Sequence, residues 1–187
     1  MRGERTRKTV PTRDAYPACK RGHVTFLPAE TYRLIEQSMP IACVDFVVVR
    51  ESGGCRELGL IRRASPQGEV WCHLGGRIQR GETIADAIRR HSRDTIGIEP
   101  PLPLNPQPGY VYEWFPPDLA PRDGTVSGDD PRKHAIGLSF VVAVDGEAQP
   151  RDEALEFAYF APDALPPNLW PGCRELFGRL GLVNARD

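Results

Sequence analysis

The chain has 187 residues, of which 40% are hydrophobic and 26% charged, a length and composition that suit one domain with a sizeable core. Its 24 basic and 25 acidic residues leave a formal net charge of −1 at pH 7, so no overall field favours nucleic acid or an anionic membrane as a partner. The longest apolar stretch, residues 41–49, is interrupted by Asp45 and is too short to span a bilayer.

The N-terminal segment and the cysteines bear on domain organisation and location. Residues 1–22 are rich in Arg, Lys, Thr and Pro, which predicts a basic flexible arm before a single domain at residues 23–187. No apolar block follows the basic segment, so no signal peptide is expected. The five cysteines form no C-x-x-C pair and are expected to be reduced thiols, which indicates a cytoplasmic protein.

The first predicted elements are a short helix and a group of strands. Pro28 suits a helix start, and the helix at residues 29–37 should end before Pro40. The β-branched run at residues 41–50 predicts a central strand, and residues 57–63 and 69–73 predict shorter strands. Asp45 alternates with apolar residues on one face of the first strand, where it either contacts a ligand or caps a buried arginine.

A glycine pair and an amphipathic helix follow these strands. Gly75 and Gly76 end an apolar run and can adopt positive φ, which predicts a tight turn where the backbone approaches a ligand. From Thr83 onward, apolar residues recur at helical spacing, so they should form one buried face, and Gly97 should end the helix. Arg90 and Asp94 share an adjacent face, where they can pair or point into a site.

The second half of the chain alternates between extended segments, strands and loops. Residues 100–108 are proline-rich and predict an extended connector, and residues 116–133 predict a long surface loop of the kind that often contacts substrate. Strands are expected at residues 110–115, 135–144 and 155–160, and a closing helix at 168–180. Strands flanked by helices predict an α/β fold.

The segment 75–98 resembles the sequence motif of Nudix hydrolases, G-x5-E-x7-R-E-U-x-E-E-x-G-U, where U is a bulky aliphatic residue. Five residues match at the required spacing: Gly76, Glu82, Arg90, Gly97 and Ile98. Three positions that hold glutamates in the motif hold His91, Asp94 and Thr95 here. The resemblance implies a Nudix fold, in which a mixed β-sheet is sandwiched between α-helices, with altered chemistry at the helix.

Within this superfamily, the chain is most similar to the GDP-mannose mannosyl hydrolases. The similarity extends over residues 26–177 and includes Asp45, Arg62, Trp71 and His134. This branch is thought to direct water to the anomeric carbon of the sugar, so that the nucleoside diphosphate departs whole. The resemblance implies that arginines and one divalent cation, Mg²⁺ or Mn²⁺, stabilise the departing diphosphate.

The resemblance also implies the site residues, although some positions depart from the branch. The metal ligands of the branch align with Gly75, Thr95 and Glu153, and Asp94 is the carboxylate that can replace Thr95. The histidine that serves as general base aligns with Ala154, so His91 or His134 would have to enter from elsewhere. The predicted sets are catalytic Arg62, Arg77, Arg90 and His134, substrate-binding Asp45, Arg62 and Arg77, and metal-binding Gly75, Asp94 and Glu153.

Two functions follow from these observations. The first is Mg²⁺-assisted hydrolysis of a nucleoside diphosphate sugar or related derivative, with water attacking either the sugar carbon or a phosphorus. The second, motivated by the altered glutamates, is a catalytically silent module that binds a nucleotide or a partner protein. The branch also implies a homodimer, for which Tyr32, Leu34 and Ile35 on the first helix form an apolar set.

Overall fold

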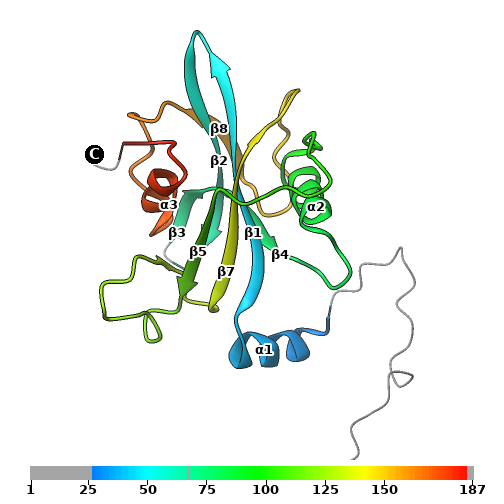
Figure 1. Ribbon diagram of the computed structural model, residues 1–187, viewed down its shortest axis with the longest axis vertical. Coiled ribbons are helices and arrows are strands. Elements are labelled where there is room, and N and C mark those ends of the chain that lie inside the picture. Colours follow the sequence, from blue (N-terminus) through cyan, green and yellow to red (C-terminus); the bar gives the residue numbers. More distant parts are fainter. Residues whose placement is uncertain (1–26, 67, 185–187) are drawn as a thin grey trace, which may run out of the picture.

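A computed structural model describes residues 27–66 and 68–184 (Figure 1). The predicted arm at residues 1–22 lies outside these described residues. Three helices occur in the described part: α1 (Ala29–Ser38), α2 (Ile84–Ile96) and α3 (Cys173–Arg179). None of them has the length and the apolar composition needed to cross a lipid bilayer.

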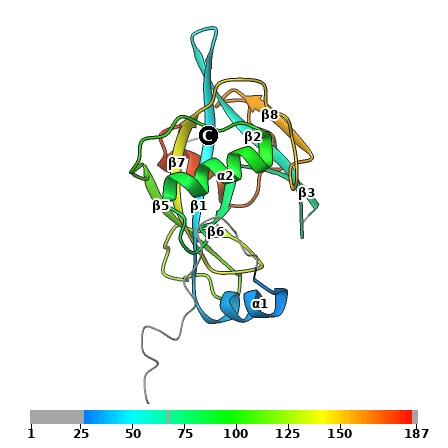
Figure 2. The same cartoon turned by 90° about the vertical axis from the view of Figure 1, so that its right-hand side faces the viewer.

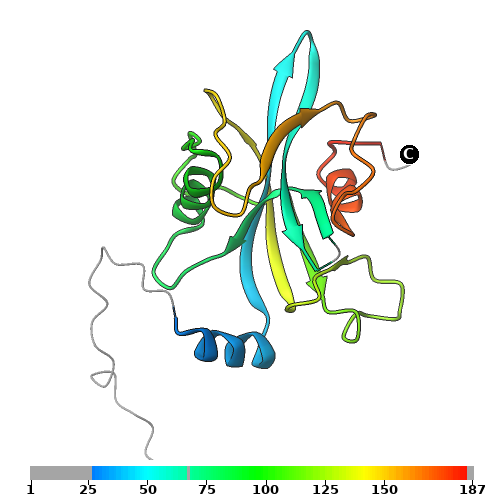
Figure 3. The same ribbon diagram turned by 180° about the vertical axis from the view of Figure 1, so that it is seen from behind.

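The strands form one mixed sheet with the order β3-β2-β1-β7-β5-β6, to which β4 and β8 are added by pairing with β1 and β2. Their bounds are β1 (Ile41–Ser52), β2 (Cys55–Ser65), β3 (Gly68–Cys72), β4 (Leu74–Arg77), β5 (Tyr110–Phe115), β6 (Gly128–Asp129), β7 (Ala135–Ala143) and β8 (Glu156–Phe160). Figures 1 and 3 show α2 and α3 on opposite sides of this sheet, which confirms the predicted α/β sandwich. Figure 2 shows α1 beyond one end of the sheet.

The central strand β1 divides one of its edges between two partners. Residues 43–46 of β1 pair with β4, and residues 48–52 pair with β2, both antiparallel. The other edge pairs in parallel with β7 along residues 41–49. Along this edge of β1, the pairing partner changes from β4 to β2, so β4 and β2 diverge from each other. The gap between them lies beside α2.

The core is built on β1 and β2 because their apolar residues face packed layers on both sides. Val44, Phe46 and Val47 are fully buried, as are Leu58 and Leu60 on β2. Burying a side chain of this size contributes about 1.5–3 kcal/mol. This rigid centre fixes the backbone from which the polar side chains of β1 and β2 project.

Helix α2 has the boundaries that its sequence predicts. The Thr83 hydroxyl accepts a hydrogen bond from the Asp86 backbone N–H at 3.1 Å, which caps the N-terminus. Gly97 has φ 76 and closes the C-terminus. Ala87, Ile88 and Ile96 are fully buried, so the predicted apolar face packs against the sheet.

The predicted tight turn at Gly75 and Gly76 is wrong. Both residues lie in β4 and pair with Asp45 and Val44 of β1. Their φ values, 138 and 157, confirm that the positions need glycine. A Cβ atom on Gly75 would also collide with the Val44 carbonyl oxygen. The glycines therefore permit close strand pairing and do not turn the chain.

The closing helix is shorter than predicted, and the long loop is less irregular. Gly172 has φ 93, a conformation that a helix interior does not use, so α3 begins only at Cys173. Before this helix, Leu169 forms an isolated bridge with Trp71: the Trp71 backbone N–H donates to the Asn168 carbonyl at 2.9 Å, and the Trp170 backbone N–H donates to the Trp71 carbonyl at 2.8 Å. Within the predicted loop at residues 116–133, the short strand β6 pairs with β5.

Candidate functional site

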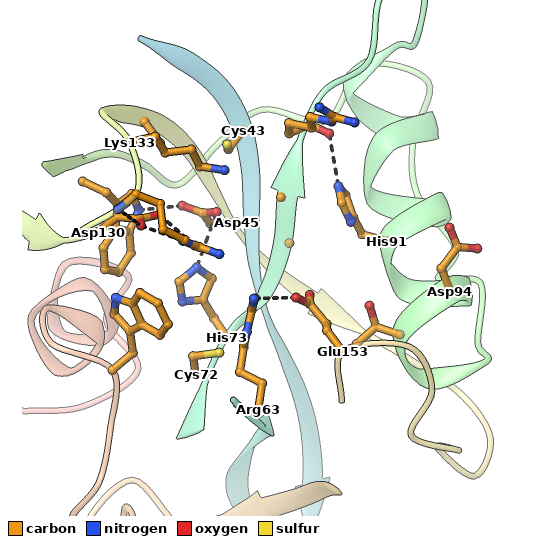
Figure 4. Close-up of a pocket in the computed structure, with 18 of the residues that line it drawn as sticks. Cys43, Asp45, Arg63, Cys72, His73, His91, Asp94, Asp130, Lys133 and Glu153 are labelled. Carbon is orange, nitrogen blue, oxygen red and sulfur yellow. Dashed lines mark hydrogen bonds and ion pairs between the residues drawn. The ribbon is translucent and has the colours of Figure 1, made fainter. Parts of the chain in front are cut away.

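A cavity of about 330 Å³ lies where β4 and β2 diverge from β1, beside α2 (Figure 4). Its walls come from β1, β2, β4 and α2, and from the segments at residues 130–133, 152–153 and 170. Most of its side chains are ionisable: Asp45, Arg63, His73, Arg77, Arg90, His91, Asp94, Asp130, Arg132, Lys133, Asp152 and Glu153. Cations and carboxylates therefore meet in one partly buried space.

Asp45 is a buried carboxylate in the wall of this cavity, 5% exposed. The Trp114 indole N–H donates to its Oδ2 at 2.9 Å, and His73 Nε2 lies 3.4 Å from its Oδ1. The His73 ring stacks on Trp114 with 5.3 Å between ring centroids. Gly137 leaves room for the carboxylate, because a Cβ atom there would collide with Oδ2. Asp45 thus has fixed partners, which a buried acid requires.

Two cysteines also line the cavity, but they are not thiolates. Burial raises the pKa of both Cys43 and Cys72 to about 12. A thiol with such a pKa stays protonated near neutral pH and is a poor nucleophile. Covalent catalysis by these cysteines is therefore not supported.

Glu82 and Arg90 form a buried ion pair that orders the segment before α2. Arg90 donates to both carboxylate oxygens, at 2.6 and 2.9 Å, and to the Arg77 carbonyl at 3.0 Å. Glu82 also accepts from the Gln79 backbone N–H at 2.8 Å. Burial alone would raise the pKa of Glu82, but the hydrogen bonds from Arg90 and Gln79 outweigh it and lower that pKa. Glu82 therefore has a structural role: it joins Arg90 on α2 to the backbone of the segment before α2.

His91 occupies one of the motif's glutamate positions and contacts β4. Its Nε2 lies 3.2 Å from the Arg77 carbonyl oxygen. Because a carbonyl can only accept, this contact requires a proton on Nε2. Burial and the neighbouring Arg90 lower the pKa of His91, which favours the neutral ring. Gly76 accommodates the ring, since a Cβ atom there would lie 2.7 Å from Cε1.

The opposite wall carries a second set of cations that sequence reasoning missed. Arg63 Nη1 lies 2.5 Å from Glu153 Oε2, and Arg132 donates to both oxygens of Asp130 at 2.8 Å. The Trp170 ring lies beneath both guanidinium groups, 5.9 Å from that of Arg63 and 5.3 Å from that of Arg132. Arg62 and Arg63 are neighbours on β2, and successive side chains of a strand point to opposite faces. The sequence could therefore have indicated that only one of the two arginines faces the cavity.

The structure brings most of the predicted site residues to the cavity, but not all. Asp45, Gly75, Arg77, Arg90, Asp94 and Glu153 line it. Arg62 does not: it pairs with Glu69 at 2.6 Å and with Glu156 at 2.9 Å. His134 also lies elsewhere, stacked on Phe115 with 4.2 Å between ring centroids.

Arg77 connects the cavity with α1. Its guanidinium lies over the Tyr32 ring, 4.1 Å from the ring centroid. Its backbone carbonyl accepts from both Arg90 and His91. The position of Arg77 is therefore fixed from both α1 and α2.

The predicted metal ligands have suitable donor types but an unsuitable arrangement. Carboxylates and a backbone carbonyl are the oxygen donors that Mg²⁺ prefers. Glu153, however, is held by Arg63, and the Asp94 side chain is 44% exposed and lies 3.5 Å from Arg93. The described residues contain no group of three or more His, Cys, Asp or Glu side chains that could hold a metal ion. As they are arranged here, these residues do not fit a divalent ion.

Sequence comparisons match the chain to one family model and to a curated relative. Residues 23–169 match the family model described as "Domain of unknown function (DUF4916)". A curated relative is the low-salt glycan biosynthesis protein Agl8 of Haloferax volcanii, 26% identical over 66% of this chain and 71% of that protein.

Solved structures with a similar fold are hydrolases. One is described as a "posible asymmetric diadenosine tetraphosphate (Ap(4)A) hydrolase" from Jonesia denitrificans: it is 29% identical with a TM-score of 0.66, over 78% of this chain and 98% of that one. Another is a MutT NUDIX hydrolase from Burkholderia pseudomallei, 19% identical with a TM-score of 0.58, over 79% of this chain and 100% of that one.

Proposed function

The chain belongs to the family described as Domain of unknown function (DUF4916) and has the fold of Nudix hydrolases, and from this premise we propose that it hydrolyses a nucleoside diphosphate sugar or a related nucleoside diphosphate derivative. The fold confirms the resemblance that residues 76–98 carry. The observation that supports this substrate class is the cavity beside α2, where Arg77, Lys133 and Arg63 meet a buried Asp45. Guanidinium and ammonium groups are the side chains that bind diphosphates.

The proposed chemistry uses charge stabilisation by side chains. If water attacks the sugar carbon, the sugar is transferred to water and the nucleoside diphosphate departs. If water attacks a phosphorus, a phosphoryl group is transferred to water and the phosphate on the other side of the broken P–O bond departs. On either route, extra negative charge develops on the departing oxygen. Arg77 and Lys133 line the cavity and can stabilise that charge. Asp45, held by Trp114 and His73, is a fixed acceptor for a hydroxyl of the substrate. Attack at the sugar carbon and attack at phosphorus are both compatible with this arrangement.

Divalent metal ions are generally used by Nudix hydrolases. Mg²⁺ at Gly75, Asp94 and Glu153 would require Glu153 to release Arg63. No step of the proposed reaction is therefore assigned to a metal ion. The four described cysteines are free, which suits the cytoplasm as the place of action.

The test is turnover of a panel of nucleoside diphosphate sugars by the purified protein, in buffers with Mg²⁺ and with EDTA. A phosphatase reports released nucleoside diphosphate, and chromatography reports a nucleoside monophosphate if a phosphate bond breaks. Heavy-oxygen water then places the label on the sugar or on the phosphate. No turnover across the panel in either buffer would reject the proposal.

A matched pair of variants connects activity with the cavity. Lys133→Ala removes a cation from the cavity wall and should lower kcat/KM by about tenfold or more, because a charged hydrogen bond contributes about 1.5–3 kcal/mol. Arg56→Ala removes an exposed cation that pairs with Glu51 at the far end of β2, and it should leave turnover unchanged.

The alternative function is a catalytically silent module that binds a nucleotide. It is favoured by His91 and Thr95, which stand where the motif has glutamates, and by the contact that ties His91 to β4. Such a module would gain thermal stability with a nucleoside diphosphate, because a ligand of the folded state stabilises it, while no substrate is turned over.

A further inference from the structure

Glu153, one of the predicted metal ligands, already pairs with a cationic side chain of the protein, that of Arg63. Arg63 Nη1 lies 2.5 Å from Glu153 Oε2, and its side chain is 20% exposed. Figure 4 shows the two side chains directed toward each other across the cavity, from β2 and from the loop before β8. The carboxylate that a divalent ion would use is thus already neutralised by a guanidinium.

A second ion pair that lines the cavity is arranged in the same way. Asp130 accepts two hydrogen bonds from the Arg132 guanidinium, both at 2.8 Å. Lys133 is the next residue and lines the cavity, and the structure gives it no acidic partner among residues 27–66 and 68–184. Glu153 and Asp130 thus position the guanidinium groups of Arg63 and Arg132. The ammonium group of Lys133 remains available to a ligand.

We propose that Arg63, positioned by Glu153, takes the place of a divalent cation, so that the cavity binds the diphosphate of its ligand through side-chain cations without a metal ion. A guanidinium has five N–H donors in a planar fork, so a bond to Glu153 leaves others for phosphate oxygens. A metal ion at Glu153 would first have to displace a charge-assisted contact of 2.5 Å. The inference rests on the proposed function for the identity of the ligand.

Binding of inorganic pyrophosphate tests the inference without turnover. Titration calorimetry in EDTA should show that pyrophosphate binds without Mg²⁺. In a separate titration, the electron paramagnetic resonance signal of free Mn²⁺ should not fall when the wild-type protein is added. Binding of pyrophosphate only with Mg²⁺, or capture of Mn²⁺ that is abolished in Glu153→Gln, would overturn the inference.

Variants of the ion pair separate the two assignments of Glu153. Arg63→Gln should weaken pyrophosphate binding in EDTA by about tenfold or more, since a charged hydrogen bond contributes about 1.5–3 kcal/mol. Arg62→Gln is the matched control: this neighbouring arginine pairs with Glu69 and Glu156 outside the cavity and should bind pyrophosphate as the wild type does. Equal affinities in Arg63→Gln and Arg62→Gln would reject the role of Arg63.

The variant Glu153→Gln distinguishes a Glu153 that positions Arg63 from a Glu153 that binds a metal ion. This test remains valid even if Arg63→Gln fails to fold. If Glu153 positions Arg63, the neutral variant should bind pyrophosphate in EDTA at least as tightly as the wild type, because the glutamine oxygen can still accept from Arg63 while a competing negative charge is removed. If Glu153 is a metal ligand, the variant should lose Mg²⁺-dependent binding. Failure of the proposed function can be told apart from failure of this inference. If the protein binds pyrophosphate in EDTA but hydrolyses no substrate, the inference about Arg63 stands and the proposed hydrolase activity is rejected.

Discussion

Replacing Arg90 by leucine should destabilise the fold because it leaves Glu82 as a buried charge without a partner. The Arg90 and Glu82 side chains are 14% and 12% exposed and are joined at 2.6 Å. Removing one partner of a fully buried pair costs about 3–5 kcal/mol, and the residual exposure here places the expected loss near the lower end, about 3 kcal/mol. The variant also loses the hydrogen bond to the Arg77 carbonyl, so the start of α2 should loosen.

Urea unfolding at neutral pH, extrapolated to water, measures this loss. The matched control is Arg93→Leu on the same helix, where the side chains of Arg93 and its partner Glu99 are both 52% exposed, so the cost should stay below about 1 kcal/mol. The pKa of Glu82 lies below its ordinary value of 4.5, so the pair stabilises the fold above that pH and loses its effect as the pH falls further. The gap between wild type and Arg90→Leu should therefore narrow in acid. Equal losses in the Arg90 and Arg93 variants would refute the reasoning.

Three further predictions concern other parts of the molecule. Gly137→Ala should displace the Asp45 carboxylate from the Trp114 N–H and cost about 1–3 kcal/mol, visible as a lower Tm, whereas an unchanged Tm would contradict the contact. The pKa of His91 lies below its ordinary value of 6.5, so the stability of the wild type should fall as the pH drops below 6.5. His91→Gln should reduce this loss of stability, and an identical loss in both proteins would exclude His91 as its cause. The homodimer implied by the resemblance should appear in sedimentation velocity and be weakened by Leu34→Glu, since Leu34 on α1 is 65% exposed; a monomeric wild type would contradict it.

Most of the elements could be predicted because local patterns agree with their packing. The β-branched run at residues 41–50 and the segment 110–115 form strands as expected, and α2 has the cap and the terminal glycine that its sequence indicates. The strand β4 was missed because Leu74–Arg77 contains two glycines, and its stability comes from pairing with β1. Strand formation of this kind depends on the tertiary partner more than on intrinsic preference.

The site was less accessible from sequence. The resemblance to a known family pointed to Arg77, Arg90 and Glu153, but it could not show that Arg90 pairs with Glu82 or that Glu153 pairs with Arg63. Alternation along β2 indicates that Arg62 and Arg63 face opposite sides, whereas the side that faces the cavity depends on the divergence of β2 and β4 from β1. Arg132 and Lys133 lie at the end of the long loop at residues 116–133, whose course no local pattern specifies.

A crystal structure of the protein with a nucleoside diphosphate and Mg²⁺ tests the central claim most directly, because it shows both the place of the diphosphate and the charges that hold it. The account predicts that the diphosphate lies in the cavity beside α2, with Arg63, Arg77 or Lys133 at hydrogen-bond distance and with Arg63 still paired with Glu153. A diphosphate outside this cavity, or a Mg²⁺ ion that joins Glu153 to the Gly75 carbonyl with Arg63 displaced, would contradict it.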